Sequence, residues 1–380
     1  MDIIYLDNSA TTKPYKEVVE EVVDCLENCY GNPSAAYKMG IDAEKKIKTS
    51  RESIAKLINS AQTDIIFTSG GSESNNTAIK GLVKSGDHVI VSGFEHKSML
   101  QTLKELEKDG VEVTYLPVDS NGIVDLEKLI ESIKGNTKLV SVMHVNNEIG
   151  SIQPISDIVK IVRDKSKKAK VHVDAVQSLS KVEIDVIKMD VDLLSLSSHK
   201  IHGPKGVGAL YVKKNLVLRP LIQGGGQEMD RRGGTENVPG ISGFGVAARI
   251  ARENFEGNKQ YIRGLKEHFI KGLLSIDDII INSPVDELHV DNILSVSFGG
   301  VRGEVLLHSL EDYNIFVSTG SACSAKKASD KNYVLPAIGL SPKYVEGTIR
   351  FSFSHMNTVE EINKTIDAIK KVLPFLRRIK

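Results

Sequence analysis

A lysine and an acid stand at the ends of two apolar segments of this sequence. Lys200 closes segment 195–200 (SLSSHK), where a turn rich in serine and histidine follows an apolar strand. Asp174 closes the strand-like segment 171–174, and Gln177 follows it. Pyridoxal phosphate needs such a pair, because the lysine holds it as a Schiff base and the acid keeps the pyridine nitrogen protonated. These residues predict a pyridoxal phosphate site.

A phosphate-binding turn is expected beside that lysine. Gly70 and Gly71 follow the strand-like segment 64–67, and Ser72 opens a predicted helix. Glycines let backbone amides approach an anion, and the free N–H groups of a helix N-terminus favour negative charge. The turn lacks the ending of a P-loop and the spacing of a dinucleotide fingerprint. On its own it is either a phosphate site or a capped helix start.

Three cysteines are too few for a disulfide framework. Cys25 and Cys29 lie on the predicted helix 16–28 or just past its end, which favours two small core residues. No second pair of metal ligands accompanies them, so no metal site is expected. Cys323 differs, because its neighbours are small and segment 321–333 reads as a polar loop. A thiol there could be exposed and mobile, as a nucleophile needs to be.

Composition and charge exclude several classes of protein. The 380 residues exceed what one hydrophobic core usually organises, which predicts two domains. The 49 basic and 49 acidic residues cancel, so no overall field recruits nucleic acid or an anionic membrane. The first residues do not resemble a signal peptide, and no run reaches the ~20 apolar residues of a membrane span. We expect a cytoplasmic protein that binds neither a membrane nor, directly, nucleic acid.

Strand-like runs alternate with amphipathic helical stretches over the first 250 residues or so. Strands are predicted at 64–67, 88–91, 111–117, 139–145, 171–173, 193–196 and 207–212, and helices at 16–28, 72–84, 98–108, 126–133 and 155–165. Such repeated units are typical of an α/β fold with a mainly parallel sheet and helices on both faces. Ligands of these sheets bind beyond the carboxyl ends of the strands. Asn147, Asp174 and Lys200 fall at or just after strand ends, so we expect them in one crevice.

The pattern changes after about residue 250. A long helical stretch is predicted at 240–274, then strands at 292–298 and 348–353 with a helix at 303–313 between them. This order predicts a smaller α+β domain beside the large one, joined by an N-terminal strand at 3–6. The expected division is a large cofactor-binding domain at 15–255 and a small domain at 1–14 and 256–380. The small domain would carry the loop of Cys323.

Ten ordered segments carry a resemblance to a known family. They are 5–12 (YLDNSATT), 31–34 (GNPS), 68–76 (TSGGSESNN), 95–96 (EH), 145–150 (VNNEIG), 173–177 (VDAVQ), 195–200 (SLSSHK), 233–235 (GGT), 321–323 (SAC) and 349–352 (IRFS). Together they resemble the NifS/IscS family of cysteine desulfurases, in the class V aminotransferase group of fold-type I pyridoxal phosphate enzymes. The order of the motifs, more than any single one, makes the resemblance specific.

The resemblance implies a role for each residue around the cofactor ring. Lys200 would carry the cofactor and shuttle protons, and Asp174 would pair with the pyridine nitrogen. Gln177 would donate a hydrogen bond to the phenolic oxygen of the ring. His96 would stack on the ring and assist proton transfer.

Phosphate and substrate binding are implied in the same way. The phosphate would be held by Gly71, Ser72, Ser197 and His199, and by Thr235 from the other subunit of a homodimer. Arg350 would clamp the substrate carboxylate as a bidentate donor, helped by Asn147. Ser72 stands where threonine is usual, and the strand end 351–355 reads FSFSH where many relatives have a Gly-Arg pair.

The implied reaction converts L-cysteine to L-alanine and leaves the sulfur as a persulfide on Cys323. The acceptor would be an iron–sulfur scaffold or a tRNA-thiolating enzyme, between which the sequence does not choose. Two alternatives stay open: another reaction on this fold, such as a selenocysteine lyase or an aminotransferase, and a non-catalytic sulfur carrier. An aminotransferase has no need of Cys323, and a non-catalytic carrier has no need of Lys200.

Overall fold

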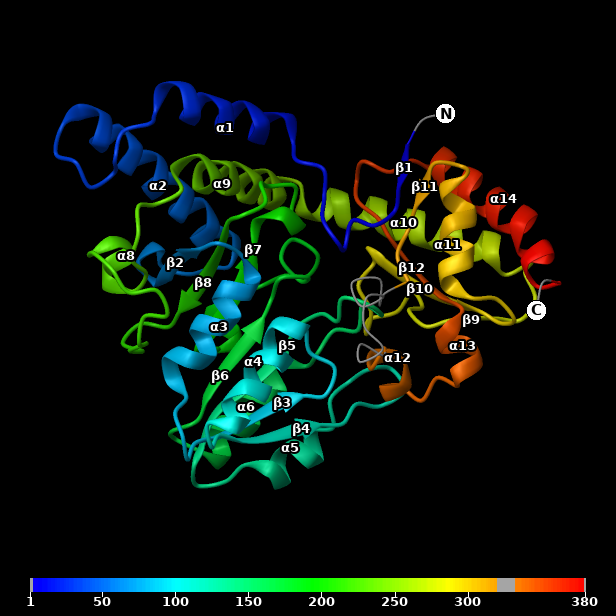
Figure 1. Cartoon of the computed structure of the whole chain (residues 1–380), viewed down its shortest axis with the longest axis horizontal. Coiled ribbons are helices and arrows are strands. Elements are labelled where there is room, and N and C mark those ends of the chain that lie inside the picture. The colour runs from blue at the N-terminus through cyan, green and yellow to red at the C-terminus, as the bar shows by residue number, and fades with distance from the viewer. Residues whose placement is uncertain (1–2, 320–331, 379–380) are drawn as a thin grey trace.

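The computed structural model describes residues 3–319 and 332–378. Most of the predicted loop at 321–333, with Cys323 in it, therefore lies outside the described residues. The chain forms a larger layered part around one sheet and a smaller part on the other side of Figure 1, which holds β1 and most of the chain from α10 onward.

A seven-stranded sheet forms the centre of the larger part. Its order is β2 (Ile65–Thr68), β8 (Gly208–Val212), β7 (Leu193–Ser197), β6 (Lys170–Asp174), β5 (Thr137–Met143), β3 (His88–Ser92) and β4 (Glu112–Leu116). Only β8 runs antiparallel to its neighbours, because β7 leads into it without a crossover helix. The inner strands are buried along nearly their whole length, as expected for a sheet covered on both faces. The predicted fold class is confirmed.

Helices cover the two faces of this sheet. On one face lie α3 (Gly71–Leu82) and α4 (Lys97–Lys108), which share apolar clusters with Val89 and Val91 of β3. On the other face the main core contains Ile90 of β3, α1 (Lys16–Asn28), α2 (Lys38–Leu57), α5 (Leu126–Ser132), α6 (Ile155–Lys165) and α9 (Val238–Glu253). Alternate side chains of one strand thus enter two different cores. Cys25 and Cys29 are buried in the main core, as predicted.

The smaller part has its own core. An antiparallel sheet of β12 (Thr348–Ser352), β10 (Ile293–Phe298) and β9 (Ile279–Ile281) packs with α10 (Phe255–Leu273), α11 (Gly303–Glu311) and α14 (Val359–Leu376). The N-terminal strand β1 (Ile4–Tyr5) pairs in parallel with β11 (Ile315–Phe316) and joins this core, as expected. The domain boundaries given above stay a prediction.

The long helical stretch predicted at 240–274 consists of two helices, α9 and α10, which part at Asn254. Both the backbone N–H of Asn254 and its side-chain amide donate to the carbonyl of Ile250, at 3.1 and 2.9 Å. A side chain that bonds to nearby backbone competes with helix continuation. The short elements not yet named are η1 (Gln62–Asp64), α7 (Val186–Met189), η2 (Ser198–Lys200), α8 (Gln227–Asp230), α12 (Val334–Ala337) and α13 (Pro342–Glu346).

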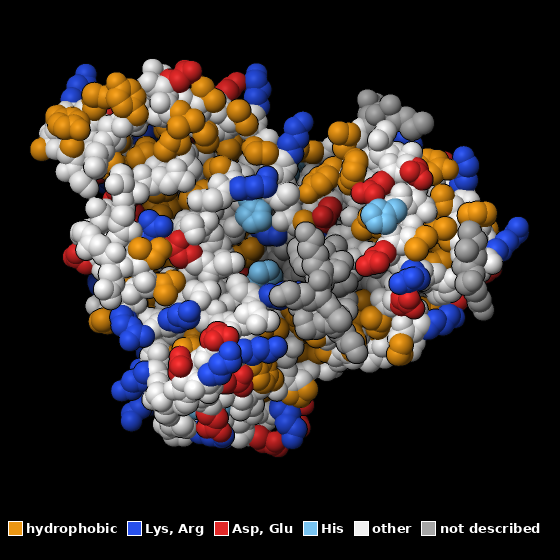
Figure 2. Space-filling model, in the orientation of Figure 1, with side chains coloured by type: hydrophobic (Ala, Val, Ile, Leu, Met, Phe, Trp, Pro, Cys, Tyr) orange, Lys and Arg blue, Asp and Glu red, His pale blue; other side chains and the backbone are white. Residues whose placement is uncertain are grey.

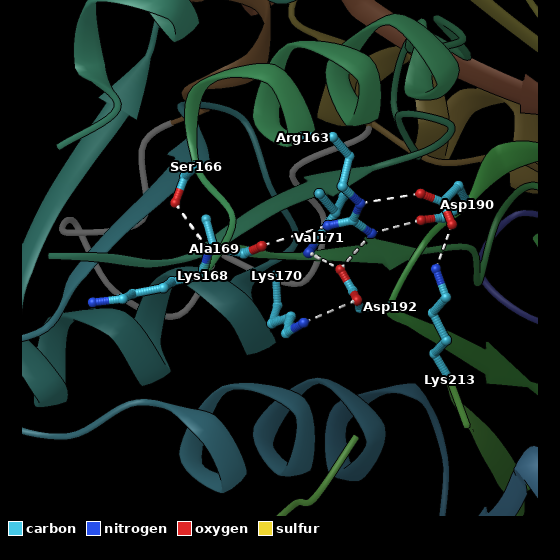
Figure 3. A network of polar contacts seen from close by, with 9 residues as sticks. All are labelled: Arg163, Ser166, Lys168, Ala169, Lys170, Val171, Asp190, Asp192 and Lys213. Atoms are coloured by element: carbon cyan, nitrogen blue, oxygen red, sulfur yellow. Dashed lines mark hydrogen bonds and ion pairs between the residues drawn. The ribbon is translucent and has the colours of Figure 1, made fainter. Parts of the chain in front are cut away.

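An ion network ties the amino-terminal edge of the central sheet together (Figure 3). Arg163 of α6 donates to Asp190 at 3.0 Å and to Asp192 at 2.8 Å. Asp192 also accepts the backbone N–H of Val171 at 2.8 Å, and Asp190 pairs with Lys213. The network therefore joins a helix to β6, β7 and β8 at the edge opposite the carboxyl ends of the parallel strands.

Candidate active site

A cavity of about 380 Å³ lies beyond the carboxyl ends of the parallel strands. Most residues predicted for the site line it, although they come from both parts of the chain: Gly71, Ser72, His96, Asn147, Asp174, Gln177, Ser197, His199, Lys200 and Arg350. Thr235 is not among the lining residues, and Cys323 lies outside the described part of the chain. The expected convergence of Asn147, Asp174 and Lys200 is confirmed.

Asp174 ends β6 and is held by two donors. Its Oδ2 accepts from the side-chain amide of Asn75 at 2.8 Å, and its Oδ1 accepts from the backbone N–H of Val176 at 3.0 Å. Only 4% of Asp174 is exposed. The ring of His172, two residues earlier, is fixed between the hydroxyls of Ser141 and Ser195. The carboxylate is thus aimed into the cavity by groups that leave it room for another partner.

Lys200 follows β7 in the short helix η2. Its Nζ donates to the backbone carbonyls of Ser9 at 2.5 Å and Ala10 at 2.8 Å. Gln177 also donates to the carbonyl of Ser9, at 2.9 Å. The N-terminal segment therefore forms the wall against which the lysine and the amide rest. Lys200 and Asp174 share one cavity, as Schiff-base formation and ring protonation require.

The turn at Gly70 leaves room for an anion. Gly70 has φ of 152°, a conformation that favours glycine, and α3 begins at Gly71. A Cβ on Gly71 would lie 2.7 Å from Val176, and one on Gly208 would lie 2.7 Å from Gly70. Side chains would therefore close this cradle. Together with the first N–H groups of α3, which have no intrahelical acceptors, the cradle fits a phosphate.

His199 and His96 lie on two walls of the cavity. Loss of water around His199, with Lys200 and Lys205 nearby, lowers the pKa of its imidazole to about 4. Loss of water around His96 also lowers the pKa of its imidazole, with Lys200 acting in the same direction and Asp174 against it. His96 caps α4 and accepts from the backbone N–H of Ser98 at 3.2 Å. Both rings are therefore neutral at pH 7, and the ring of His96 is fixed in orientation.

Arg350 reaches the cavity from β12 of the smaller part. Its Nη2 pairs with Asp7 at 2.7 Å, its Nη1 donates to the carbonyl of Asn147 at 2.7 Å, and its buried Nε has no partner in the described structure. The guanidinium is thus held in place with donor capacity left over. A planar, fixed guanidinium is well suited to a small carboxylate ligand.

A second buried acid, Glu95, lies just before His96. Its Oε1 accepts from Ser92 at 2.5 Å and from the backbone N–H of Met143 at 2.6 Å, so it joins the ends of β3 and β5. Burial, together with the charge of Asp174, raises the pKa of Glu95 to about 8. Its Oε2 is buried with no partner among the described residues. This carboxyl is therefore protonated at neutral pH.

Sequence reasoning missed several residues that build the cavity. Asp7 and Ser9 lie in segment 5–12, yet their roles depend on contacts with residues far along the chain. Asn75 lies one helical turn after Gly71, and that spacing places both on one face of α3. Glu148 also lines the cavity. All four residues stand in segments that carry the family resemblance, and the i, i+4 spacing of Asn75 from Gly71 was a further signal.

Comparison with known proteins identifies the family of this chain. The family Aminotransferase class-V matches residues 4–365. A protein named cysteine desulfurase IscS from Clostridium botulinum (strain Hall) is 42% identical over 97% of this chain and 94% of its own length. Proteins of the same name from Methanosarcina thermophila and Vibrio vulnificus (strain YJ016) are 41% and 44% identical, over 99% and 98% of this chain and 93% of each relative.

Solved structures show the same relationship. A NifS-like protein superposes with a TM-score of 0.92 at 40% identity, covering 99% of this chain and all of that one (100%). A structure described as SspA in complex with cysteine gives a TM-score of 0.81 at 37% identity, covering 92% of this chain and 98% of its own. The chain therefore belongs to aminotransferase class V and, within it, to the cysteine desulfurases, whose cofactor is pyridoxal phosphate.

Proposed function

We propose that this enzyme takes sulfur from L-cysteine through a persulfide on Cys323, with the cavity residues in the roles given above. One observation carries the assignment of Cys323. Ser318 and Asn332, which lie on either side of it in the sequence, both line the cavity. The described residues that precede and follow the segment of Cys323 therefore both lie at the cavity wall. We infer that a thiol tethered between them meets a bound substrate and then an acceptor.

Each side chain has a defined task in this proposal. When bound, pyridoxal phosphate withdraws electrons from the α-carbon of the substrate. Lys200 removes and returns the proton at that carbon, while Asp174 keeps the pyridine nitrogen protonated. Gln177 hydrogen-bonds the phenolic oxygen, and His96 stacks on the ring and assists proton transfer. The phosphate rests on Gly71 and on the neighbouring residues Ser72, Ser197 and His199.

Arg350 and Cys323 have the tasks of substrate binding and sulfur transfer. Arg350 orients the carboxylate of L-cysteine, helped by Asn147, which already accepts from its Nη1 through the backbone carbonyl. The thiolate of Cys323 attacks the substrate sulfur, so an S–S bond forms and the C–S bond breaks. The electron pair of the broken C–S bond stays on the β-carbon of the substrate, which takes a proton as alanine forms. The sulfur remains on Cys323.

A homodimer is part of the proposal. Thr235 is exposed and does not line the cavity of its own chain, so its proposed phosphate contact has to be made in a partner subunit. Large apolar side chains are exposed near α1 and α2, where Figure 2 shows hydrophobic atoms gathered at the upper left: Val19, Val23, Leu26, Tyr30, Tyr37, Met39 and Ile41. A patch of this kind marks an interaction surface. We assign it to a second copy of the chain.

The acceptor of the sulfur is an iron–sulfur scaffold or a tRNA-thiolating enzyme, and a cytoplasmic location stays a prediction. No helix in the described part of the chain is long and apolar enough to cross a membrane. Incubating the persulfide-loaded enzyme with each kind of acceptor and following the sulfur by mass spectrometry distinguishes the two.

The experiment that tests the proposal replaces Cys323 by serine. A serine hydroxyl is hardly ionised at neutral pH, so Cys323→Ser should bind pyridoxal phosphate and L-cysteine but release almost no alanine. Mass spectrometry after one turnover of the wild-type enzyme should find the extra sulfur on the peptide that contains Cys323. Cys25→Ser and Cys29→Ser serve as matched controls and should stay active, because both thiols are buried in the main core. A persulfide on either of them contradicts the assignment.

A further inference from the structure

The turn α8 (Gln227–Asp230) is left-handed. Glu228, Met229 and Asp230 have φ of 49°, 58° and 63°. None of them is glycine, and an L-residue in this region brings its Cβ close to the following carbonyl oxygen. Single residues adopt this conformation, but three in succession persist only where surrounding contacts hold them.

A buried ion pair holds this turn. Glu228 makes two parallel hydrogen bonds with Arg51 of α2, Nη1 to Oε2 and Nη2 to Oε1, both 2.7 Å. The side chains of Arg51 and Glu228 are 14% and 3% exposed. A bidentate pair fixes the relative position and orientation of both groups, which a single contact between point charges does not. The first left-handed residue is thus locked to α2.

The same pair is fastened to the outer edge of β2, beside α8 in Figure 1. The backbone N–H of Phe67 donates to Glu228 at 2.8 Å, and Arg51 donates to the carbonyl of Ile65 at 2.6 Å. The guanidinium also lies 4.7 Å above the centre of the Phe67 ring. β2 is a terminal strand of the sheet, so the pair satisfies groups that otherwise face outward. Two residues after β2 comes Gly70, where the phosphate cradle begins.

On its other side, α8 leads into the loop that carries Thr235. This loop is closed by the N–H of Gly233 donating to the carbonyl of Ile222 at 2.9 Å, and by that of Gly234 donating to Gln227 at 3.1 Å. Gln227 is itself the first residue of α8, so α8 makes one of the two hydrogen bonds that close the loop.

A second ion pair links the loop to the cradle. Arg232 pairs at 3.0 Å with Glu73, in the first turn of α3 next to Ser72. Burial acts to raise the pKa of Glu73, but hydrogen bonds from Arg232 and Ser69 outweigh it and lower the pKa. Glu73 is therefore ionised and holds the loop against α3.

We propose that Arg51 and Glu228 are positioning residues for phosphate binding. Their ion pair holds α8 in its left-handed conformation. This conformation positions the loop of Thr235 toward the phosphate site of the partner subunit and aligns the cradle at Gly70 in the same subunit. Neither residue touches the cofactor. The inference rests on the proposed homodimer and on the proposed role of Thr235.

The test measures the affinity of the apoenzyme for pyridoxal phosphate by absorbance titration. Glu228→Gln keeps the size of the side chain and removes the charge, and it should raise the dissociation constant roughly tenfold or more. Adding Met229→Gly should restore affinity, because glycine adopts the left-handed turn without strain and needs no ion pair to hold it. Arg163→Lys, which weakens the network of Figure 3, is the matched control and should leave the affinity unchanged.

Thermal unfolding provides a second measurement that does not depend on the Glu228 variant. Met229→Gly alone should raise the melting temperature, whereas Lys104→Gly, in the right-handed helix α4, should lower it. A Met229→Gly variant that melts lower than the wild type overturns the proposal, because α8 is then not strained. An unchanged dissociation constant in Glu228→Gln, or weak binding that Met229→Gly does not restore, overturns it too.

Thr235→Val, titrated alongside, separates this inference from the function on which it rests. Unchanged affinity in Thr235→Val contradicts the phosphate contact of Thr235. That result says nothing about strain in α8, because the strain is measured separately by the melting temperature of Met229→Gly.

Discussion

The buried polar groups at the two edges of the central sheet differ in how fully they are hydrogen-bonded. At the amino-terminal edge, Arg163, Asp190 and Asp192 satisfy one another within hydrogen-bonding distance, and the carboxylate of Asp192 also takes a backbone N–H. At the carboxyl edge, buried polar atoms lack partners in the described structure: Ser9 Oγ, Asn75 Oδ1, Glu95 Oε2, Ser198 Oγ and Arg350 Nε.

This difference shows how one sheet serves both architecture and chemistry. A buried polar atom without a partner costs free energy, about 1–3 kcal/mol for each neutral group. A satisfied network stabilises the fold and has little left to offer a ligand. The unsatisfied groups around Lys200 and Asp174 favour a ligand that bonds to them. Binding of the cofactor is thus expected to stabilise the fold as well.

The largest effect is expected from Lys200→Ala. Without the amine, no Schiff base forms and no side chain at this position moves the substrate proton, so turnover should fall by at least about 10³-fold. Alanine release measures the loss of turnover, and the absorbance of the bound cofactor measures the loss of the Schiff base. Lys205→Ala changes an exposed lysine five residues along and should keep both the turnover and the Schiff base. Full activity in Lys200→Ala would show that the reaction does not take place at the carboxyl edge of the sheet.

Asp174→Asn should have the next largest effect. Asparagine keeps the shape and the hydrogen bond from Asn75 but cannot stabilise a protonated pyridine nitrogen, so kcat should fall roughly 10²-fold or more. Steady-state alanine formation and the absorbance spectrum of the holoenzyme are the measurements.

Asp192→Asn makes the same change at the opposite edge and is the matched control. It breaks a partly exposed ion pair and should lower the free energy of unfolding by about 2 kcal/mol. Its kcat should stay near that of the wild type. If the two substitutions reduce activity equally, the functional contrast between the edges is lost.

The smallest effect concerns the pH dependence of stability and Glu95. Its pKa is about 8 in the folded chain against an ordinary 4.5, so between these values the folded state holds a proton that the unfolded state has released. Stability from this group therefore falls as pH rises through that window. Glu95→Gln does not titrate, and its melting temperature relative to the wild type should rise from pH 4.5 to about pH 8. Parallel melting curves for the two proteins across this range would show that Glu95 is already ionised when folded.

Much of the fold was determined by local sequence. The period and length of the apolar patterns predicted the central strands and the helices α1, α3, α4 and α6 to within a few residues. The strands are recognisable because a strand that is buried on both faces is a continuous apolar run. The break at Asn254 was missed, since helical periodicity continues through it and only a side chain bonding to the backbone ends the helix.

The site divides in the same way. Strand ends alone were enough to bring Asn147, Asp174 and Lys200 together, because parallel strands share one carboxyl edge. Tertiary structure decided the contact of Lys200 with the carbonyl of Ser9, 191 residues away, and the pairing of Arg350 with Asp7. Contacts between distant segments depend on how two cores pack, and no short-range pattern encodes that packing. The buried Glu95 and the left-handed turn α8 likewise became apparent only once their surroundings had formed.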